Sequence, residues 1–240
     1  LLLLFVMGCI FSVAMPSASA NVNDGLVAYY TFDGDLNDSS GNGNNGSGTV
    51  EFEDAKFGKG VFLDGSNYVT VKDNDSLDLT EDFTFAVWLY KEESDQFNIP
   101  ILRKCKSDDF FKGPYSFFLG SGGKIPGVYL VDENERDWAE LYGDGEVIGT
   151  QNWTHVAVTK KGSSVRFYKN GKACGDAEAD YVGTLLSNSQ NLIIGMDAYN
   201  RSYYKGIMDE LRIYNKALTD AEIKALYEST SGAATTPAAP

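Results

Sequence analysis

The sequence is poor in the residues on which most catalytic and metal-binding motifs depend. It has one histidine, His155, and three cysteines among 240 residues. A single histidine excludes a histidine-rich zinc site, and the cysteines stand too far apart in the sequence to form a thiolate metal motif. The chain also lacks a Gly-x-Ser-x-Gly nucleophile turn and a phosphate-binding loop. The sequence therefore gives no support to these catalytic classes.

Positive charge is scarce as well. Lys and Arg number 20 against 34 Asp and Glu, which gives a formal net charge of −14. Nucleic-acid binding needs Lys and Arg to displace counterions from phosphates, and binding to an anionic membrane surface needs them too. We therefore expect no nucleic-acid partner. The negative charge fits a soluble extracellular protein that could hold a cation.

The first 20 residues form an uncharged, mostly apolar stretch that ends in Ala18-Ser19-Ala20. This pattern predicts a secretory signal peptide over 1–20, cleaved after Ala20, and a secreted or cell-surface protein. A membrane anchor is the alternative, but the run is short and interrupted by Pro16. A lipoprotein cleavage site at Cys9 is weaker, because apolar residues continue beyond it. After removal of the signal we expect no membrane insertion.

The rest of the chain divides into one domain over 21–229 and a tail over 230–240. The tail is rich in small residues and proline, which is typical of a linker or a disordered end. Two cysteines remain in the domain, Cys105 and Cys174, each after a predicted strand. In an oxidising compartment we predict that they form a disulfide. The alternative is two unrelated thiols, one of them buried.

Short β-like runs dominate the domain, and their spacing predicts an antiparallel β-sandwich or barrel. The runs lie at 26–32, 60–63, 68–71, 83–90, 155–159, 165–169 and 191–195. The run at 83–90 is apolar on both faces, which predicts a central strand. Asn170-Gly171 predicts a tight hairpin turn.

One helix is predicted near the end of the domain. Thr219 and Glu222 have the spacing of a capping box at a helix N-terminus. Ile223, Leu226 and Tyr227 then share one face of the helix, and we expect this face to pack on the sandwich.

Five stretches resemble the laminin-G-like jelly-roll domains of the concanavalin-A-like lectin/glucanase superfamily, in the version common in secreted bacterial proteins. They are 28–33, 38–46, 57–65 with Tyr68-Val69, 152–159 leading to 167–171, and 205–224. They occur in family order and cover nearly all of 25–228. The resemblance implies an all-β jelly roll with one short C-terminal helix, of a kind that is mostly non-catalytic. It does not define a ligand, because the fold hosts lectins, enzymes and adhesion modules.

A pair of acids, Asp209 and Glu210, interrupts the apolar strand predicted after Lys205. The resemblance implies that this strand lies beside the first strand region, and that a calcium ion is often held there. Calcium takes six to eight oxygen ligands from carboxylates, amides and carbonyls. The candidate ligands are Asp33, Asp38, Asn42, Asn44, Gly46 and Asp209. The alternative is turn chemistry alone in the loop. Because neighbours on a strand face opposite sides, we expect Glu210 to point away from Asp209 and to pair with a base such as Arg212.

Aromatic residues in polar loops are the candidates for glycan binding, because sugar rings pack on aromatic faces. They are Trp138, Tyr199, Tyr203 and Tyr204, with Arg201 as a hydrogen-bonding partner. The alternative is local packing of these rings against the sandwich.

The segment 135–140 spells Glu-x-Asp-x-x-Glu and resembles the catalytic strand of laminarinase-type glucanases. Glu135 and Glu140 would then be the two catalytic acids on either side of the scissile bond. An acidic edge strand is the alternative. We predict a secreted, non-catalytic module that binds an extracellular glycan or acts in adhesion and is stabilised by calcium. A glycoside hydrolase that uses Glu135 and Glu140, and a structural protein–protein module, stay open.

Overall fold

The computed structural model describes residues 22–105, 113–135, 138–144, 148–180, 182–197 and 201–231, with only the backbone given for Trp138, Thr230 and Ser231. The predicted signal peptide, the aromatic candidate Tyr199 and the tail beyond Ser231 lie outside these residues. The strands are β1 (Leu26–Tyr30), β2 (Gly46–Ser47), β3 (Glu51–Asp54), β4 (Lys59–Asp64), β5 (Val69–Val71), β6 (Phe83–Lys91), β7 (Ile99–Arg103), β8 (Tyr115–Leu119), β9 (Ile125–Val131), β10 (Trp138–Tyr142), β11 (Trp153–Lys161), β12 (Ser164–Lys169), β13 (Lys172–Glu178), β14 (Leu192–Ile194) and β15 (Lys205–Tyr214). The helical segments are η1 (Asp75–Leu77), α1 (Gly120–Gly123) and α2 (Asp220–Ser231).

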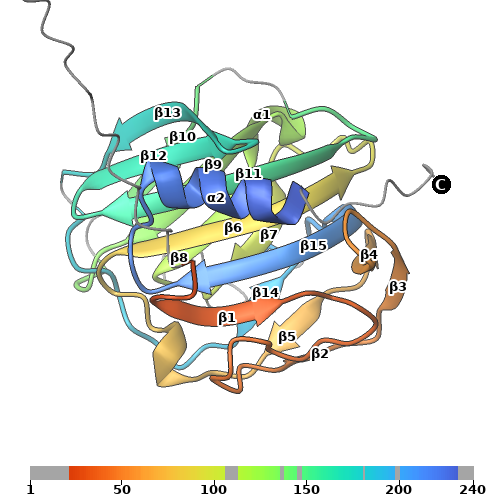
Figure 1. The fold of residues 1–240 in the computed structure, drawn as a ribbon. Helices are drawn as coiled ribbons and strands as arrows, with labels where there is room; N and C mark the ends of the chain where they lie inside the picture. The colour runs from red at the N-terminus through yellow and green to blue at the C-terminus, as the bar shows by residue number, and fades with distance from the viewer. Residues whose placement is uncertain are drawn as a thin grey trace, which may run out of the picture.

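The strands form two antiparallel sheets that pack face to face (Figure 1). Sheet A has the order β13-β12-β11-β6-β15-β4-β3, with β1 also paired to β15. Sheet B has the order β10-β9-β8-β7-β14-β5-β2. Helix α2 lies across the outward face of sheet A, over β6 and β11 (Figure 1). The predicted all-β sandwich with one C-terminal helix is confirmed.

Alternating side chains of both sheets fill the space between them. Phe83 and Phe85 of β6 point inward and stack on each other at 4.5 Å between ring centres. Across the core, Phe85 lies 5.1 Å from the ring of Tyr115 and 6.1 Å from that of Phe117, both on β8. Each fully buried side chain of this size contributes roughly 1.5–3 kcal/mol through the removal of apolar surface from water. The packing of the inward-facing aromatic rings of β6 and β8 thus stabilises the contact between the two sheets.

The local signals in the sequence form as expected. Asn170 and Gly171 both have positive φ, 50° and 74°, in the tight turn between β12 and β13. At the start of α2, the Thr219 N–H donates to the Glu222 carboxylate at 2.7 Å, and the Glu222 N–H donates to the Thr219 hydroxyl at 3.3 Å. The capping box is therefore formed, and the helix begins at the next residue, Asp220.

Apolar residues of α2 seal the middle of the outward face of sheet A. Ile223 and Leu226 are buried against Ala86, Ala157 and Tyr168 of the sheet. Helix α2 extends to Ser231, so the first two residues of the predicted tail are helical. Within the described part of the chain, none of the helices is both long and apolar enough to cross a membrane.

Among the described strands, register shifts interrupt the regular pairing at four places, and two of them concern the sites below. In β15 the pairing with β6 shifts between Asp209 and Arg212, and Glu210 has a positive φ of 54°. In β7 the pairing with β8 shifts between Pro100 and Leu102. A bulge inserts one extra residue and re-aims the side chains beside it. Both bulges lie next to charged groups that matter below.

Candidate functional site

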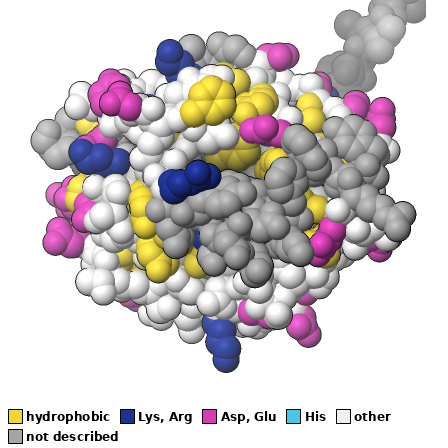
Figure 2. Space-filling view, turned by 180° about the vertical axis from the view of Figure 1, so that it is seen from behind, with side chains coloured by type: hydrophobic (Ala, Val, Ile, Leu, Met, Phe, Trp, Pro, Cys, Tyr) yellow, Lys and Arg dark blue, Asp and Glu magenta, His cyan; other side chains and the backbone are white. Residues whose placement is uncertain are grey.

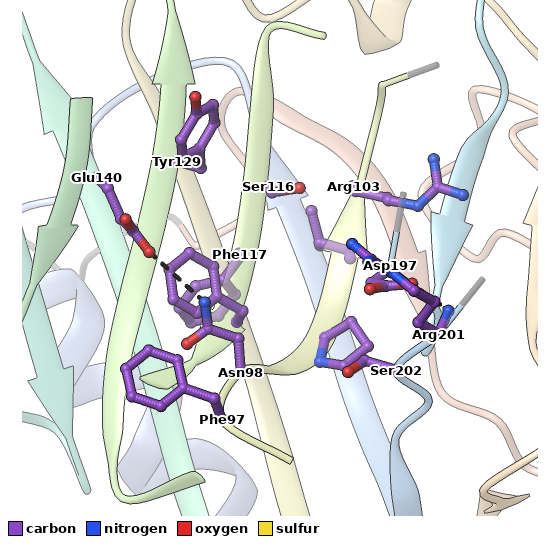
Figure 3. A pocket seen from close by; sticks show the side chains of 13 residues that line it. Phe97, Asn98, Arg103, Ser116, Phe117, Tyr129, Glu140, Asp197, Arg201 and Ser202 are labelled. Atoms are coloured by element: carbon purple, nitrogen blue, oxygen red, sulfur yellow. Dashed lines mark hydrogen bonds between the residues drawn. The ribbon is translucent and has the colours of Figure 1, made fainter. Parts of the chain in front are cut away.

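A hollow opens on the outward face of sheet B, on the side of the molecule opposite α2. We call it the sheet-B hollow, and its volume is about 360 Å³. Figure 2 shows this side of the molecule, on which hydrophobic side chains gather in a patch with charged side chains nearby. The side chains that bear on its chemistry are Phe97, Asn98, Arg103, Tyr129, Glu140 and Asp197 (Figure 3).

Aromatic rings form one wall of the hollow. Tyr129 of β9 packs with Phe118 of β8 on the outward face, in a small cluster separate from the main core. Phe97, in the loop before β7, has 71% of its surface exposed at the rim. An exposed ring at the rim of a concave site is available for contact with a ligand.

Glu140 supplies a carboxylate at the same end of the hollow. It lies on β10 opposite Tyr129 of β9. The Tyr142 hydroxyl donates to its Oε1 at 2.6 Å, and the Asn98 amide reaches the same atom at 3.5 Å. These donors orient the carboxylate while leaving Glu140 exposed to solvent. The arrangement can accept hydrogen bonds from the hydroxyl groups of a ligand.

Arg103 lies at the other end of the hollow (Figure 3), with only 2% of its surface exposed. Its Nε donates to the Met196 carbonyl at 3.0 Å, and its Nη1 donates to the Cys105 carbonyl at 2.7 Å. The bulge in β7 places Arg103 opposite Ser116 on the outward face. Strict alternation from Ile99, which faces the core, would turn Arg103 inward.

A second group of buried charges lies on the outward face of sheet A. The Asp209 side chain is fully buried, and its Oδ2 accepts a hydrogen bond from the Phe57 N–H at 2.8 Å. Its Oδ1 is buried and has no hydrogen-bond partner among the described residues. The pKa of Asp209 is raised to about 8. Burial is the main cause, and the negative charges of Glu210 and Asp33 act in the same direction, while the hydrogen bond from the Phe57 N–H lowers the pKa. A carboxylate with an unsatisfied buried oxygen fits a bound cation.

Asp33 is a second acid whose charge acts on Asp209. Its Oδ1 accepts a hydrogen bond from the Lys59 N–H at 2.8 Å, two residues after the N–H that binds Asp209. Between them, Gly58 has a positive φ of 53°, and a Cβ there would stand 2.1 Å from Asp33 Oδ1. Only glycine lets this loop approach the carboxylate so closely.

Three of the remaining predicted calcium ligands form hydrogen bonds within the 38–46 loop and with the backbone of β1. Asp38 accepts hydrogen bonds from the N–H groups of Tyr29, Ser40 and Asn44, at 2.8–3.0 Å. Asn42 and Asn44 donate to the Val27 carbonyl, each at 3.0 Å. This is the turn chemistry of the alternative interpretation.

The six predicted calcium ligands are divided between the two sheets. Gly46 pairs with Val71 in sheet B, whereas Asp209 binds the loop before β4 in sheet A. Across the described residues, no three or more His, Cys, Asp or Glu side chains converge in a metal-binding group. Asp33 acts electrostatically on Asp209, whereas the side chains of the 38–46 loop bond mainly to the backbone of β1.

Glu210 does not point away from Asp209 as expected. Because of the bulge, both residues lie on the outward face of β15 together with Arg212. The Glu210 carboxylate accepts hydrogen bonds from the Tyr29 hydroxyl at 2.8 Å and from Arg212 Nη2 at 2.7 Å. The predicted pairing of Glu210 with Arg212 is confirmed.

His155 lies in the same outward layer, beneath the helix. Its ring is 5.4 Å from Trp88 and 6.1 Å from Tyr227 of α2. Burial lowers the pKa of His155 to about 3, and the charge of Arg212 acts in the same direction. The imidazole is therefore neutral at physiological pH and is packed rather than poised for catalysis.

The predicted glycan-binding aromatics have different positions. Tyr204 is fully buried, and its hydroxyl approaches the Ile207 carbonyl at 3.4 Å, so the expectation of an exposed ring is corrected. Tyr203 is half-buried and lies 6.5 Å from the ring of Tyr68. Arg201 is exposed and lines the sheet-B hollow. Tyr199 and the Trp138 side chain lie outside the described part.

The predicted disulfide between Cys105 and Cys174 is absent, and both residues are buried thiols. Cys105 follows β7 in sheet B, where its sulfur lies 3.5 Å from Arg103 Nη1. Cys174 lies on β13, the outermost strand of sheet A, where its carbonyl accepts a hydrogen bond from the Asp144 N–H. The two residues belong to different sheets and different neighbourhoods, which sequence separation alone does not reveal.

The glucanase-like pair is not carried on one strand. Glu135 has a positive φ of 55° in the turn after β9, whereas Glu140 lies within β10, which begins at Trp138. The two-acid geometry of a glucanase strand is therefore not formed here. The sequence pattern singled out Glu140 only as a glucanase-type acid and did not predict that it lines the hollow. It also did not predict Phe97 or Arg103 as site residues. A phenylalanine within the polar segment before β7 was the available sequence signal for Phe97.

The two packed sheets and the polar, ring-lined hollow define a lectin-type jelly-roll domain. A family described as "Concanavalin A-like lectin/glucanases superfamily", in its laminin-G-like form, matches residues 63–224. The chain belongs to this family. No curated protein matches the chain.

Several solved structures share the fold. Domain 4 of AbnA, a GH43 extracellular arabinanase from Geobacillus stearothermophilus in complex with arabinotriose, is 24% identical with a TM-score of 0.68, over 84% of this chain and 98% of that one. The binding domain of Paraclostridial Mosquitocidal Protein 1 is 19% identical with a TM-score of 0.69, over 87% and 53%. Botulinum neurotoxin type C, whose cell entry depends upon interaction with two ganglioside molecules, is 20% identical with a TM-score of 0.68, over 88% and 52%. The chain thus spans about half the length of these toxin chains.

Proposed function

We propose that this chain is a secreted, non-catalytic glycan-binding module whose ligand lies in the sheet-B hollow. The observation that carries the proposal is one hollow lined by the exposed ring of Phe97, the ring of Tyr129 and the oriented Glu140 carboxylate. Rings that pack on sugar faces, with a few fixed polar groups that bind hydroxyls, are the usual means of carbohydrate recognition. The arabinotriose-bound domain and the ganglioside-dependent toxin support the same class of ligand.

The test is a glycan array with and without calcium, which reads ligand class and metal dependence together. Glu140→Gln removes the acceptor charge in the hollow and is expected to weaken binding by about tenfold, the size of a lost charge-assisted hydrogen bond. Glu51→Gln is the matched control, because Glu51 is an exposed glutamate on β3, an edge strand of the other sheet. Binding to no glycan at all would overturn the proposal and favour a protein–protein module.

A reducing-sugar assay on β-glucans separates the module from the glucanase alternative. The expected result is no release of reducing ends by the wild-type chain or by Glu135→Gln. Activity that disappears with Glu135→Gln or Glu140→Gln would contradict the non-catalytic role.

We also propose that calcium stabilises the module at Asp33 and Asp209. The unpartnered Oδ1 of Asp209 and the Asp33 carboxylate would supply two ligands, with Asp209 giving up its proton as the ion binds, and backbone carbonyls and waters would supply the others. The ion would neutralise the charge that burial makes costly at this position. Its role there is structural, since the pair lies in sheet A while the hollow lies on sheet B.

Thermal melting in EDTA and in calcium checks this assignment. At 100 times the dissociation constant a ligand adds about 2.7 kcal/mol of stability, so calcium is expected to raise the melting temperature by several degrees. Asp209→Asn is expected to abolish the rise. Asp38→Asn serves as the control, because it disturbs the 38–46 loop and should lower the melting temperature while preserving the response to calcium. An unchanged response in Asp209→Asn would place the ion elsewhere.

A further inference from the structure

We infer that the ligand of the sheet-B hollow is an oligosaccharide with a single acidic sugar unit, whose carboxylate binds Arg103. This inference rests on the proposed glycan-binding function and adds the charge and the length of the ligand. Four observations carry it: the burial of Arg103, the absence of an acidic partner for it among the described residues, its place between two hollows and the position of Glu140.

Arg103 is fixed as a buried, directed cation. Two backbone carbonyls, those of Met196 and Cys105, hold Nε and Nη1, so the guanidinium plane cannot rotate freely. Its Nη2 donates to none of the described residues, and no described carboxylate lies within ion-pair distance of it. By contrast, the equally buried Lys104 has two acidic partners, Asp73 and Asp78, at 2.8 and 2.7 Å.

A buried cation whose partners among the described residues are two carbonyls and one thiol lacks a countercharge there. Taking a charge out of water costs several kcal/mol unless a countercharge and further hydrogen bonds offset it. The guanidinium presents its donors in a planar fork that matches a carboxylate. An incoming carboxylate would therefore gain more at Arg103 than at a solvated surface arginine.

Arg103 stands at the junction of two hollows. It lines the sheet-B hollow and also a neighbouring hollow of about 270 Å³, which is bounded by Tyr68, Asn191 and Met196. Tyr68 is partly exposed and packs near Tyr203. Rings therefore lie on both sides of the arginine, Phe97 and Tyr129 on one and Tyr68 on the other. This layout fits a chain of sugar units that crosses Arg103 rather than a single sugar.

The acids of the hollow limit how much negative charge the ligand can carry. Glu140 lies at the end away from Arg103, and Asp197 lies near Arg201 with its Oδ1 accepting the Arg201 N–H at 2.8 Å (Figure 3). A second acidic unit at the Glu140 end would face a like charge, which disfavours binding. The geometry thus selects one acidic unit among neutral ones.

Titration calorimetry with matched sugars tests the inference. The first series is 3′-sialyllactose, its methyl ester and lactose. The second series is xylotriose with and without a glucuronic acid branch. The two series distinguish a sialic acid carboxylate from a glucuronic acid carboxylate. At least one free acid is expected to bind about tenfold or more tightly than its neutral counterpart, the effect of a hydrogen-bonded charge pair. Trigalacturonate, with an acid on every unit, is expected to bind more weakly than the preferred mono-acid.

Two variants assign the effect to the arginine. Arg103→Met is expected to bind the acid and its neutral counterpart equally, while Asp197→Asn, which removes a competing negative charge, is expected to strengthen acid binding. Arg166→Met is the matched control, because Arg166 is an exposed arginine on β12 of the other sheet. If the melting curve shows that Arg103→Met does not fold, the inference is tested by comparing the affinities of the wild-type chain for 3′-sialyllactose and for its methyl ester.

The outcomes separate this inference from the proposed function. Equal binding of acids and neutral sugars by the wild-type chain overturns the inference and leaves the glycan-binding role intact. Binding of trigalacturonate as tight as that of the mono-acid overturns the single-charge geometry. Binding of neither neutral nor acidic sugars overturns both proposals.

Discussion

Trp88, His155 and Tyr168 lie on the outward face of sheet A under helix α2, whereas Phe97 and Tyr129 lie at the outward face of sheet B with no described helix above them. On sheet A the rings fill the space beneath the helix. On sheet B similar rings border a hollow together with charged groups. The two faces have comparable aromatic content and different surroundings.

This difference shows that an aromatic ring indicates a binding site only when nothing of the chain itself covers it. Trp88 stacks on Tyr227 of the helix at 5.4 Å and meets Phe57 edge-on at 5.9 Å. Its contacts are satisfied within the fold, so it contributes to stability. Phe97 exposes most of its surface, so a ligand that covers the ring would gain the free energy of burying it. Four substitutions test this division, from the largest expected effect to the smallest.

Trp88→Ala should have the largest effect on stability and little effect on glycan binding. Trp88 is only 3% exposed, and truncating a buried aromatic ring typically costs about 3–5 kcal/mol through lost burial and a cavity. Chemical denaturation measures the loss, and calorimetry below the melting point measures binding. A strong loss of affinity in a folded Trp88→Ala would mean that the two faces are coupled.

Protonation of His155 should destabilise the covered face at acidic pH. Its pKa is about 3 in the fold and near 6.5 when unfolded, so the unfolded chain binds more protons between these values. Stability is therefore full above pH 6.5 and falls as the pH drops toward 3, by on the order of a few kcal/mol in total. His155→Phe should flatten the pH 4–6.5 part of a melting-temperature profile. The contribution of His155 is refuted if both proteins lose stability equally.

Phe97→Ala should reverse the pattern of Trp88→Ala. Because the ring is mostly exposed, the free energy of unfolding should stay within about 0.5 kcal/mol of the wild-type value, as for ordinary surface changes. Affinity for the best array glycan should fall by about tenfold, the typical cost of truncating an aromatic contact residue. Phe97→Tyr keeps the ring and should retain most of the affinity.

Thr219→Ala should have the smallest effect, because it removes only the helix cap. Loss of the hydrogen bond from the Glu222 N–H to the Thr219 hydroxyl is expected to cost about 1 kcal/mol. Thr219→Ser preserves this bond and is the control. Glycan affinity should be unchanged in both, and a change would show that α2 influences the hollow from the opposite side of the sandwich.

Local patterns in the sequence predicted the elements and the class of fold. The apolar run at 83–90, the Asn170-Gly171 turn and the Thr219–Glu222 capping box each depend on a few adjacent residues, and each forms as predicted. The resemblance added the topology, which the family match supports. The local features are predictable because they depend on interactions between residues close in the sequence. The topology was predictable because the sequence resembles a family of known fold.

The candidate site was much less predictable because bulges orient its charges. Counting alternate residues places Arg103 inward and separates Asp209 from Glu210, yet the bulges in β7 and β15 reverse both results. A bulge depends on how two distant strands pair, and one strand's sequence does not reveal it. The 38–46 loop shows a different limit, since its sequence does not reveal that Asp38 accepts the Asn44 N–H and that the Asn44 amide donates to the Val27 carbonyl of β1.

The bulge in β15 also determines where the length of this strand can change. Before it, Lys205–Met208 pair with β4, and after it, Leu211–Tyr214 pair with β1, while β6 accompanies both halves. Glu210 is the extra residue between them, so its deletion would leave Met208 and Leu211 facing the core as they do now. Deletion of an interior residue elsewhere in the strand would turn the following side chains over and bring Arg212 or Asp209 into the core. Deletion of one residue from β15 is therefore compatible with the fold at the bulge and incompatible with it in the strand segments on either side of the bulge.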